Sequence, residues 1–419
     1  MQKVYMCIDL KTFFDSVECV ERNLDPFTTN LVVADPRRGN GAICLAVSPK
    51  MKMQGVRNRC RIFEIPKSID YIVAIPRMKK YIEYAANVYG IYLKYFSKDD
   101  IHVYSIDEVF IDCTAYLKLY KKNPIELAKM VIQDVYDTYG LTATSGIGTN
   151  MYLAKIALDI TAKHSPNNIG WLTEEKYKKE LWNHRPLTDF WQVGSGIEKR
   201  LNKMRIYDMY DVAHADTKRL YKEFGVNAEL LIDHSWGKES CTMADIKAYK
   251  TKTKSISNSQ ILHRDYSYDE ARIVVKEMVE LGSLRLVSDK LMTCSVHLYI
   301  GYSNNNIKAA EGSYRMINHS NVYSELLKAF LNIYDRITDR QEKIIKIGVS
   351  FENLVEVRNE QLNLFVDQKK IDKERKLENA INDIKKNMGK NSVLRGLNYL
   401  ESATMRERNK MIGGHNSGE

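Results

Sequence analysis

Apolar runs and amphipathic segments alternate along the first 170 residues of the chain. Residues 4–10 are apolar except for one aspartate and predict a buried strand, and residues 101–113 predict a β-hairpin with two acidic residues at its tip. A further strand is predicted at 142–148, and the apolar spacing predicts helices at 13–22, 77–96, 125–139 and 153–162. This mixture of strands and helices predicts an α+β sheet domain.

The pattern changes after residue 170. Residues 171–236 are helical and basic with no convincing strand, and residues 245–258, rich in lysine and serine, predict an exposed linker. Residues 261–357 predict the order strand, helix, strand, strand, helix, strand. The charged stretch 358–419 leaves two interpretations open, a partner-binding helix and a largely disordered tail. Its apolar residues at helical spacing are Ile371, Leu377, Ile381 and Ile384.

Length and composition limit the class of protein. A chain of 419 residues exceeds what one hydrophobic core organises, so several domains are expected. The 44% of hydrophobic and 28% of charged residues are typical of a soluble globular protein. No apolar run approaches the ~18 residues of a membrane helix. The first residues, MQKVYMCIDL, show no signal-peptide pattern, so we expect a cytoplasmic protein with no membrane partner.

Cysteine usage and charge narrow this further. The seven cysteines lie far apart and form no C-x-x-C pair, which argues against a zinc site and against a disulfide framework. The formal net charge of +10 favours a polyanionic partner such as nucleic acid.

Three acidic residues stand out because they adjoin apolar segments. Asp9 ends the first strand, and Asp107 and Glu108 form the tip of the hairpin. Buried carboxylates are costly unless a partner compensates them, and Mg²⁺ prefers such hard oxygen ligands. On the acids alone, a turn exposed to solvent is the simpler interpretation. The surrounding motifs reverse that judgement.

Three motifs carry a family resemblance. They are C-I-D-L-K-T-F-F-D-S-V-E at 7–18, Y-S-I-D-E-V-F-I-D at 104–112 and S-G-I-G-T-N-M-Y-L-A-K-I-A at 145–157. With these motifs the chain resembles the Y-family translesion DNA polymerases, in particular their UmuC-like bacterial branch. The resemblance covers essentially the whole chain. It implies a multidomain right-hand polymerase with an α+β palm, small fingers, a helical thumb and an α+β little finger.

The resemblance also implies domain bounds. The palm would comprise 1–23 and 76–165, and the fingers 24–75. The thumb, with a helix-hairpin-helix, would span 166–240, followed by a linker at 241–257. The little finger would span 258–357, and a tail with a clamp-binding motif 358–419.

Catalytic roles follow residue by residue from the resemblance. Asp9, Asp107 and Glu108 take the positions of catalytic metal ligands for two Mg²⁺ ions, with the Leu10 carbonyl as an extra ligand. Phe14 takes the position of the steric gate, which excludes a nucleotide 2′-hydroxyl.

Other residues would hold the incoming dNTP. Phe13, next to the gate, is a core aromatic at the start of a helix and part of the nucleotide-binding segment. Lys52 and Lys163 take positions that contact the triphosphate. Many family members have Arg at the position of Lys52 and Tyr or Asn at that of Pro49, which has no side-chain donor.

Further residues would grip primer–template DNA without reading its sequence. Gly194, Ser195 and Gly196 resemble a helix-hairpin-helix turn, where backbone N–H groups bind a phosphate. Basic side chains would add contacts to the DNA backbone. They are Lys252, Lys254, Arg264 and Arg315.

The tail contains a possible docking peptide. Residues 361–365 resemble the pentapeptide by which bacterial polymerases bind the β subunit of the sliding clamp. Its residues at the groove would be Gln361, Leu362, Leu364 and Phe365. The alternative is the edge of a last strand packed on the little finger. An accessory mutagenesis protein is a further expected partner.

The expected function is template-directed, low-fidelity translesion DNA synthesis from dNTPs during the response to DNA damage, in the nucleoid. No segment remains for a proofreading exonuclease. One rival is a catalytically silent damaged-DNA-binding protein of the same fold, against which the three acids argue. A nucleotidyl cyclase on a similar palm is a second rival, although a cyclase needs no thumb for a duplex.

Overall fold

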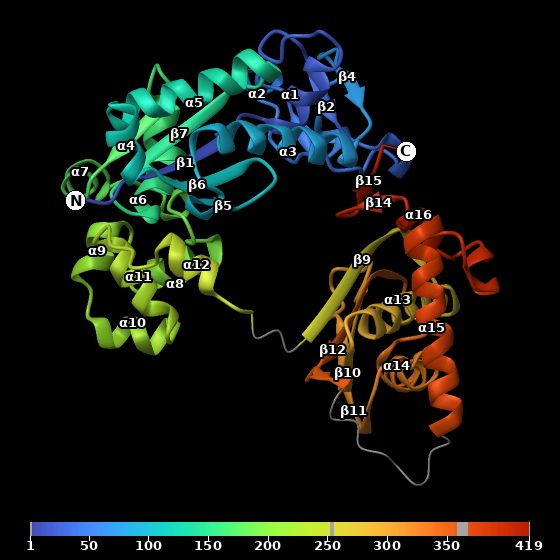
Figure 1. Cartoon of the computed structure of the whole chain (residues 1–419). Helices are drawn as coiled ribbons and strands as arrows, with labels where there is room; N and C mark the ends of the chain where they lie inside the picture. Colours follow the sequence, from blue (N-terminus) through green and yellow to red (C-terminus); the bar gives the residue numbers. More distant parts are fainter. Residues whose placement is uncertain (1, 252–254, 358–367, 419) are drawn as a thin grey trace. The chain divides into compact units, whose positions relative to one another are not determined.

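The computed structural model describes residues 2–251, 255–357 and 368–418 (Figure 1). They form two compact units, the first ending at residue 249 and the second beginning at residue 250. Both units combine helices with sheets, which confirms the predicted α+β class. None of the helices in these ranges combines the length and apolar character that crossing a bilayer requires.

The first unit is built on a sheet with the strand order β5-β6-β1-β7-β8. The central strand β1 (Tyr5–Leu10) pairs antiparallel with β6 (Glu108–Asp112) and with β7 (Ala143–Gly148). β5 (Ile101–Val103) completes the predicted hairpin with β6, and β8 (Ile169–Leu172) lies parallel to β7. The hairpin and the strand at 142–148 are thus confirmed.

Strand β8 corrects the prediction that no strand follows residue 170. In the sequence, Gly170 suggests that no strand continues through this position. In the structure, close packing requires glycine there, because a Cβ atom would lie 2.4 Å from the Ala157 carbonyl oxygen. The same holds on β7, where a Cβ atom at Gly146 would lie 2.1 Å from the Ala154 carbonyl oxygen. These glycines allow the helical segment formed by α6 (Met151–Ile156) and η4 (Ala157–Thr161) to lie directly on the sheet.

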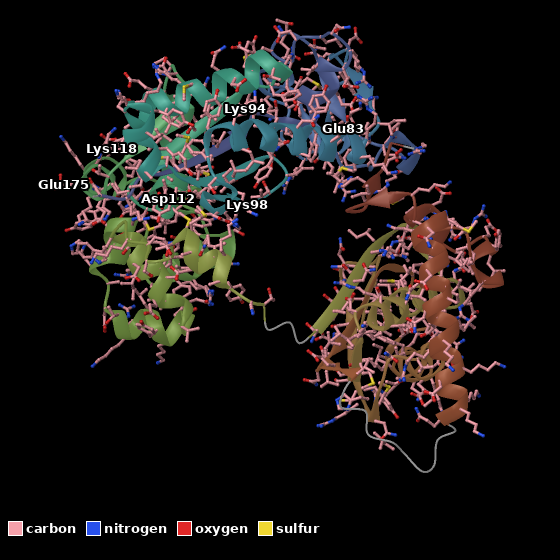
Figure 2. The ribbon with its side chains drawn as sticks, viewed as in Figure 1. Glu83, Lys94, Lys98, Asp112, Lys118 and Glu175 are labelled. Atoms are coloured by element: carbon pink, nitrogen blue, oxygen red, sulfur yellow. The ribbon has the colours of Figure 1, made fainter. Side chains whose placement is uncertain are left out.

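Two long helices contribute to the same core. Asn123 caps α5 (Pro124–Tyr139), and Gly140 ends it in the left-handed conformation. α3 (Met78–Tyr95) packs against α5, and Lys94 on α3, labelled in Figure 2, pairs with Asp134 on α5 at 3.2 Å. Their inward apolar residues join those of β1 in one core, which confirms the helical predictions for both segments.

A small sheet with the order β3-β2-β4 lies within the predicted fingers. Its strands are β2 (Leu31–Val33), β3 (Ala46–Val47) and β4 (Ile72–Ala74), and α2 (Pro49–Met53) follows β3. Val32 and Val47 on one face of this sheet belong to a separate small core, whereas Leu31, Val33 and Ala46 on the other face join the core around β1.

The remainder of the first unit is helical, as predicted. Its helices are α7 (Glu174–Leu181), α8 (Ser195–Lys203), α9 (Met209–His214), α10 (Thr217–Phe224), α11 (Asn227–Ser235) and α12 (Met243–Ala248).

The predicted linker at 245–258 is wrong at both ends. Helix α12 occupies its start, because a capping box of Thr242 and Asp245 begins the helix and Met243 is buried against β1 and β6. At its other end, β9 (Ser255–Tyr266) already begins at Ser255. The first residues of β9 are mostly polar because several of them face solvent.

The second unit has the predicted element order. β9 is followed by α13 (Tyr268–Ser288), β10 (Leu291–Tyr302), β11 (Ala310–Ser320), α14 (Tyr323–Ile337) and β12 (Ile344–Glu352). The sheet order is β11-β10-β12-β9, and the short β13 (Val355–Glu356) pairs with β10. Figure 1 shows the sheet, then α13 and α14, and then α15 as three successive layers.

Residues 368–417 form an ordered extension of this unit. It contains α15 (Gln368–Met388), α16 (Met405–Arg408) and a hairpin of β14 (Met411–Ile412) and β15 (His415–Asn416). Glu378 on α15 is buried and accepts hydrogen bonds from the Ser283 hydroxyl and the Tyr323 N–H. The interpretation of a largely disordered tail is therefore wrong for these residues.

Candidate active site

The sheet brings the three predicted acids together along the backbone. Asp9 on β1 stands directly opposite Glu108 on β6 in the antiparallel register. The N–H of Leu10 donates to the carbonyl oxygen of Asp107 at 3.0 Å, so that residue also adjoins the end of β1. Segments separated by about a hundred residues in sequence thus bring three acidic residues to one end of β1.

Glu108 is the most firmly held of the three. Its buried carboxylate accepts from Lys155 Nζ at 2.9 Å and from Cys7 Sγ at 3.1 Å. Lys155 also reaches Asp159 at 3.2 Å. Burial by itself lowers the pKa of Lys155, but Asp159 and Glu108 outweigh it and raise the pKa. Lys155 therefore stays charged and acts as the counter-ion of Glu108.

Asp9 is in the opposite situation. Burial, followed by the charges of Asp107 and Glu108, raises the pKa of Asp9 to about 7. In the part of the chain that the structure describes, no hydrogen bond or ion pair to its carboxylate is found, and the charge of Lys155 lowers its pKa without offsetting these effects. Asp107 accepts from the Ser105 hydroxyl at 2.6 Å. The site thus concentrates negative charge, and among its acids Glu108 is the one held by an ion pair within the described residues, that with Lys155 at 2.9 Å.

The chemistry of this donor set fits a hard divalent cation. Carboxylate oxygens are the ligands that Mg²⁺ prefers, and a cation would relieve the repulsion that raises the pKa of Asp9. As the side chains stand, no three potential ligands among the described residues converge closely enough to hold an ion. The Glu108 carboxylate is engaged by Lys155 and Cys7 instead.

The two phenylalanines after β1 differ in environment. Both lie on α1 (Phe13–Val20), but Phe13 is only 2% exposed and belongs to the core. Phe14 is half-buried and packs on Tyr81 with ring centroids 4.8 Å apart. Phe13 thus sits as predicted for a core aromatic, and Phe14 is the ring that reaches the surface.

A buried network supports Phe14 from behind. The Tyr81 hydroxyl donates to Glu18 at 2.7 Å, and Arg77 donates to both oxygens of Glu18 at 2.9 Å. Burial alone would raise the pKa of Glu18, but the hydrogen bonds from Arg77, Tyr81 and Arg22 lower it. Sequence reasoning missed this support, although Glu18 closes the first quoted motif.

The two predicted triphosphate ligands lie on different elements. Lys52 is half-buried on α2, where burial lowers its pKa and the charges of Asp15 and Asp9 raise it. Lys163 is exposed and lies in the 3-10 turn η5 (Ala162–His164), which follows η4. Pro49 occupies the first turn of α2, a position that proline favours, so its side chain serves the helix start.

The predicted DNA-contacting residues are exposed wherever the structure describes them. Gly194 is the N-cap of α8, with Ser195 and Gly196 in its first turn. A Cβ atom at either glycine would meet no atom within 4 Å, so the fold itself does not demand glycine there. Arg264 pairs with Glu270 at 2.7 Å, and Arg315 lies on β11. Lys252, Lys254 and the clamp-binding residues 361–365 lie outside the described residues.

Two further residues of the site were missed by sequence reasoning. Lys155 and Cys7 both lie within the quoted motifs but were given no role. The spacing of Lys155 and Asp159, four residues apart, was an available signal of an ion pair on one helical face. Nothing in the sequence indicated that this pair would turn toward Glu108.

Comparisons with known proteins agree with the motifs. The impB/mucB/samB family matches residues 8–159, and the C-terminal domain of that family matches residues 253–364. The UV-damage repair protein UvrX of Bacillus subtilis is 30% identical over 421 residues, covering 99% of this chain and 98% of the relative. DNA polymerase IV 2 of Halalkalibacterium halodurans is 29% identical, covering 99% of this chain and 100% of the relative.

A solved structure extends the likeness to the fold. The Y-family DNA polymerase chimera Dbh-Dpo4(243-245)-Dbh superposes with a TM-score of 0.63 at 19% identity, covering 84% of this chain and 99% of the other. The chain therefore has the right-hand fold that the motifs predicted. By its motifs, its family matches and its fold, the chain belongs to the impB/mucB/samB family, the Y-family of translesion DNA polymerases.

Proposed function

We propose that this chain is a low-fidelity translesion DNA polymerase that adds dNTPs to a primer 3′-hydroxyl opposite damaged DNA by two-metal nucleotidyl transfer, without proofreading. DNA-directed DNA polymerase activity itself follows from the family. The single observation that carries the finer proposal is the register that sets Asp9 opposite Glu108, beside Asp107.

Asp9, Asp107 and Glu108, with the Leu10 carbonyl, are the residues that would hold the two Mg²⁺ ions. Bound ions would supply activation of the attacking hydroxyl and charge neutralisation at the leaving phosphates. The chain's own contribution is to hold the acids in place. Lys155 does so for Glu108 through their 2.9 Å ion pair.

The surroundings of the acids suit a deoxynucleotide. Phe14, held by Tyr81, would lie against the sugar and exclude a 2′-hydroxyl. Lys52 and Lys163 would neutralise charge on the triphosphate, which is the main requirement of phosphoryl transfer.

Primer–template DNA would bind through exposed backbone and basic side chains. The start of α8 offers N–H groups that approach a phosphate without obstruction from a side chain at Gly194 or Gly196. The family implies docking of the segment 361–365 on the sliding clamp, an accessory mutagenesis protein and a cytoplasmic, nucleoid-associated location.

Primer extension by the full chain tests the proposal. With Mg²⁺ and dNTPs, we expect template-dependent extension on intact DNA and past an abasic site, with mismatches left unexcised. A silent damaged-DNA-binding protein would bind the same DNA and yield no product. A nucleotidyl cyclase would turn over nucleotide without any template.

The substitution Asp107→Ala tests the metal assignment. It should abolish extension, because one of three carboxylates is lost, while DNA affinity stays within a few fold as binding rests on other residues. A binding assay with the same primer–template serves as the control. Synthesis by this variant at a wild-type rate would refute the assignment.

A further inference from the structure

Helix α1, which carries the predicted steric gate Phe14, also contains an acidic residue that is buried without a hydrogen-bond partner in the described part of the chain. Asp15 is 0% exposed and follows Phe14 directly on α1. Neither of its carboxylate oxygens has a hydrogen-bond partner among the described residues. Burying an unpaired carboxyl is among the most unfavourable arrangements in a folded protein. Asp15 therefore needs an explanation other than stability.

The neighbouring acid on the same helix shows what a structural carboxylate looks like. Glu18 is buried to the same degree, but Arg77, Tyr81 and Arg22 all donate to it. Asp15 has no arginine or tyrosine donor in the described part of the chain, and besides Lys52 only Thr12 and its own backbone are found to lower its pKa. The two acids lie one helical turn apart, so the difference arises from what faces them and not from the helix itself.

Lys52 is the cation whose charge acts on Asp15. Burial raises the pKa of Asp15 to about 7, and the charge of Lys52 is the largest influence that lowers it. In return, burial lowers the pKa of Lys52, and Asp15 and then Asp9 raise it. Helix α1 packs on β3, and α2, which carries Lys52, begins two residues after that strand ends.

The two charges influence each other without touching. No ion pair or hydrogen bond joins Asp15 to Lys52 within the described ranges of the chain. Lys52 also feels the charge of Asp9, a predicted metal ligand. The charges of Asp15 and Asp9 therefore both stabilise the Lys52 ammonium group, and no ion pair to either of them is found among the described residues.

We propose that Asp15 is a positioning residue, whose buried carboxylate holds the Lys52 ammonium over the catalytic acids, ready to receive the triphosphate of a dNTP. This inference rests on the proposed function. A lysine on a short helix of the fingers would otherwise extend into water, and ordering it would cost side-chain entropy at each binding event. Because Lys52 makes no direct bond to Asp15, its ammonium group can bind the triphosphate in place of that carboxylate at little cost in free energy.

Steady-state primer extension with Asp15→Ala and Asp15→Asn tests this role. For both variants we expect the KM for dNTP to rise about tenfold while kcat changes little, since binding is weakened and the catalytic acids are intact. Asp15→Asn retains the shape of the side chain and guards against a packing artefact. Asp15→Ala should also raise the Tm, because it removes an unpaired buried carboxyl.

A double-mutant cycle identifies the partner. Lys52→Ala alone should raise the KM for dNTP, and Asp15→Ala combined with Lys52→Ala should raise it no further, because the two residues act as a unit. The control is Asp112→Ala, which removes a buried acid that is paired with Lys3 at 2.7 Å and lies at the other end of β6. That variant should lower the Tm and leave the KM unchanged.

Three results would overturn the inference. They are an unchanged KM in both Asp15 variants, a lower Tm with kcat and KM changed together, and additive effects of Asp15→Ala and Lys52→Ala. An inactive wild-type protein would instead refute the proposed function, so the two failures are distinguishable.

Discussion

At the scale of single residues, the site is a set of buried acids that differ in whether a cation in contact balances their negative charge. Glu108 and Glu18 have cations beside them, whereas Asp9 and Asp15 have none in contact. The motifs identified Asp9, Asp107 and Glu108 from sequence. They did not reveal Lys155 or Asp15, because which side chain faces a carboxylate depends on packing between segments far apart in the chain.

The first prediction concerns pH and Asp15. Its pKa is raised to about 7 in the folded protein, from 3.8, so the folded state binds more protons than the unfolded state between these values. Stability associated with this group is present below pH ~4 and is lost as the pH rises through about 7. The Tm advantage of Asp15→Ala over wild type should therefore widen from pH 5 to pH 8.

Calorimetry of the two proteins at matched ionic strength measures this difference. A Tm gap that is constant across the range, or that narrows toward pH 8, would contradict the raised pKa.

The second prediction concerns Phe14 as the gate. Phe14→Ala should increase ribonucleotide incorporation relative to dNTP by about 100-fold, equivalent to ~2.7 kcal/mol, because the ring that excludes the 2′-hydroxyl is gone. Single-nucleotide insertion with matched rNTP and dNTP measures the ratio. Tyr81→Phe, which keeps the ring contact with Phe14 and removes the hydrogen bond to Glu18, is the control and should discriminate as wild type does. Unchanged discrimination in Phe14→Ala would place the gate elsewhere.

At the scale of elements, helix ends in the second unit are capped by acids from distant segments. Val322, the N-cap of α14, gives no side-chain hydrogen bond. Glu378 and Glu374 of α15 accept from the first N–H groups of α14, at 3.0 Å from Tyr323 and 2.9 Å from Ser324. These contacts satisfy donors that a helix start leaves open, and they fix α15 to the unit.

This arrangement explains why the apolar spacing in the tail does not predict which side of α15 is buried. Leu377 and Ile384 are 58% and 38% exposed, whereas the buried side of α15 includes Glu378. Asn382, also on this side, donates to the Leu284 carbonyl oxygen. A helix that docks by charged and amide groups cannot be found from a hydrophobic pattern, because that pattern assumes an apolar face toward the core.

The third prediction concerns these caps. Glu378→Ala should destabilise the second unit by about 2 kcal/mol, because it leaves a buried N–H at the start of α14 without an acceptor. Chemical denaturation followed by circular dichroism measures the change. Glu325→Ala, in the first turn of the same helix α14, removes a carboxylate that accepts no hydrogen bond from another described residue; it is the matched control and should shift stability by less than ~0.5 kcal/mol. Equal effects of the two substitutions would show that the contact contributes nothing.

At the scale of the whole molecule, the order of elements was predictable and their boundaries were less so. The second unit follows the predicted order of strand, helix, strand, strand, helix, strand, because each element has a clear period. β8 was missed because Gly170 interrupts its apolar run, although close packing against Ala157 requires that glycine. Met243 likewise gave no sign in sequence that it would anchor α12 against β1.

The fourth prediction concerns the clamp. Phe365→Ala should remove stimulation of primer extension by the β sliding clamp and leave clamp-free extension unchanged, because the apolar anchor of the docking peptide is lost while the first unit is untouched. Extension on a long primed template, with and without loaded clamp, measures this. Equal stimulation of the variant and wild type would favour the alternative interpretation, a strand edge packed on the little finger.

The glycines of β7 that lie beneath α6 limit which amino-acid substitutions the protein tolerates. At Gly146 even alanine would bring a methyl group to 2.1 Å from the backbone nitrogen of Leu158, so substitution forces the helical segment away from the sheet. Lys155 belongs to that segment, and its contact with Glu108 would be displaced as well. In a saturation library selected for function, we therefore expect almost no amino-acid substitution to be recovered at positions 146 and 148. Substitutions at positions 194 and 196 should leave the fold intact and reduce only the affinity for DNA.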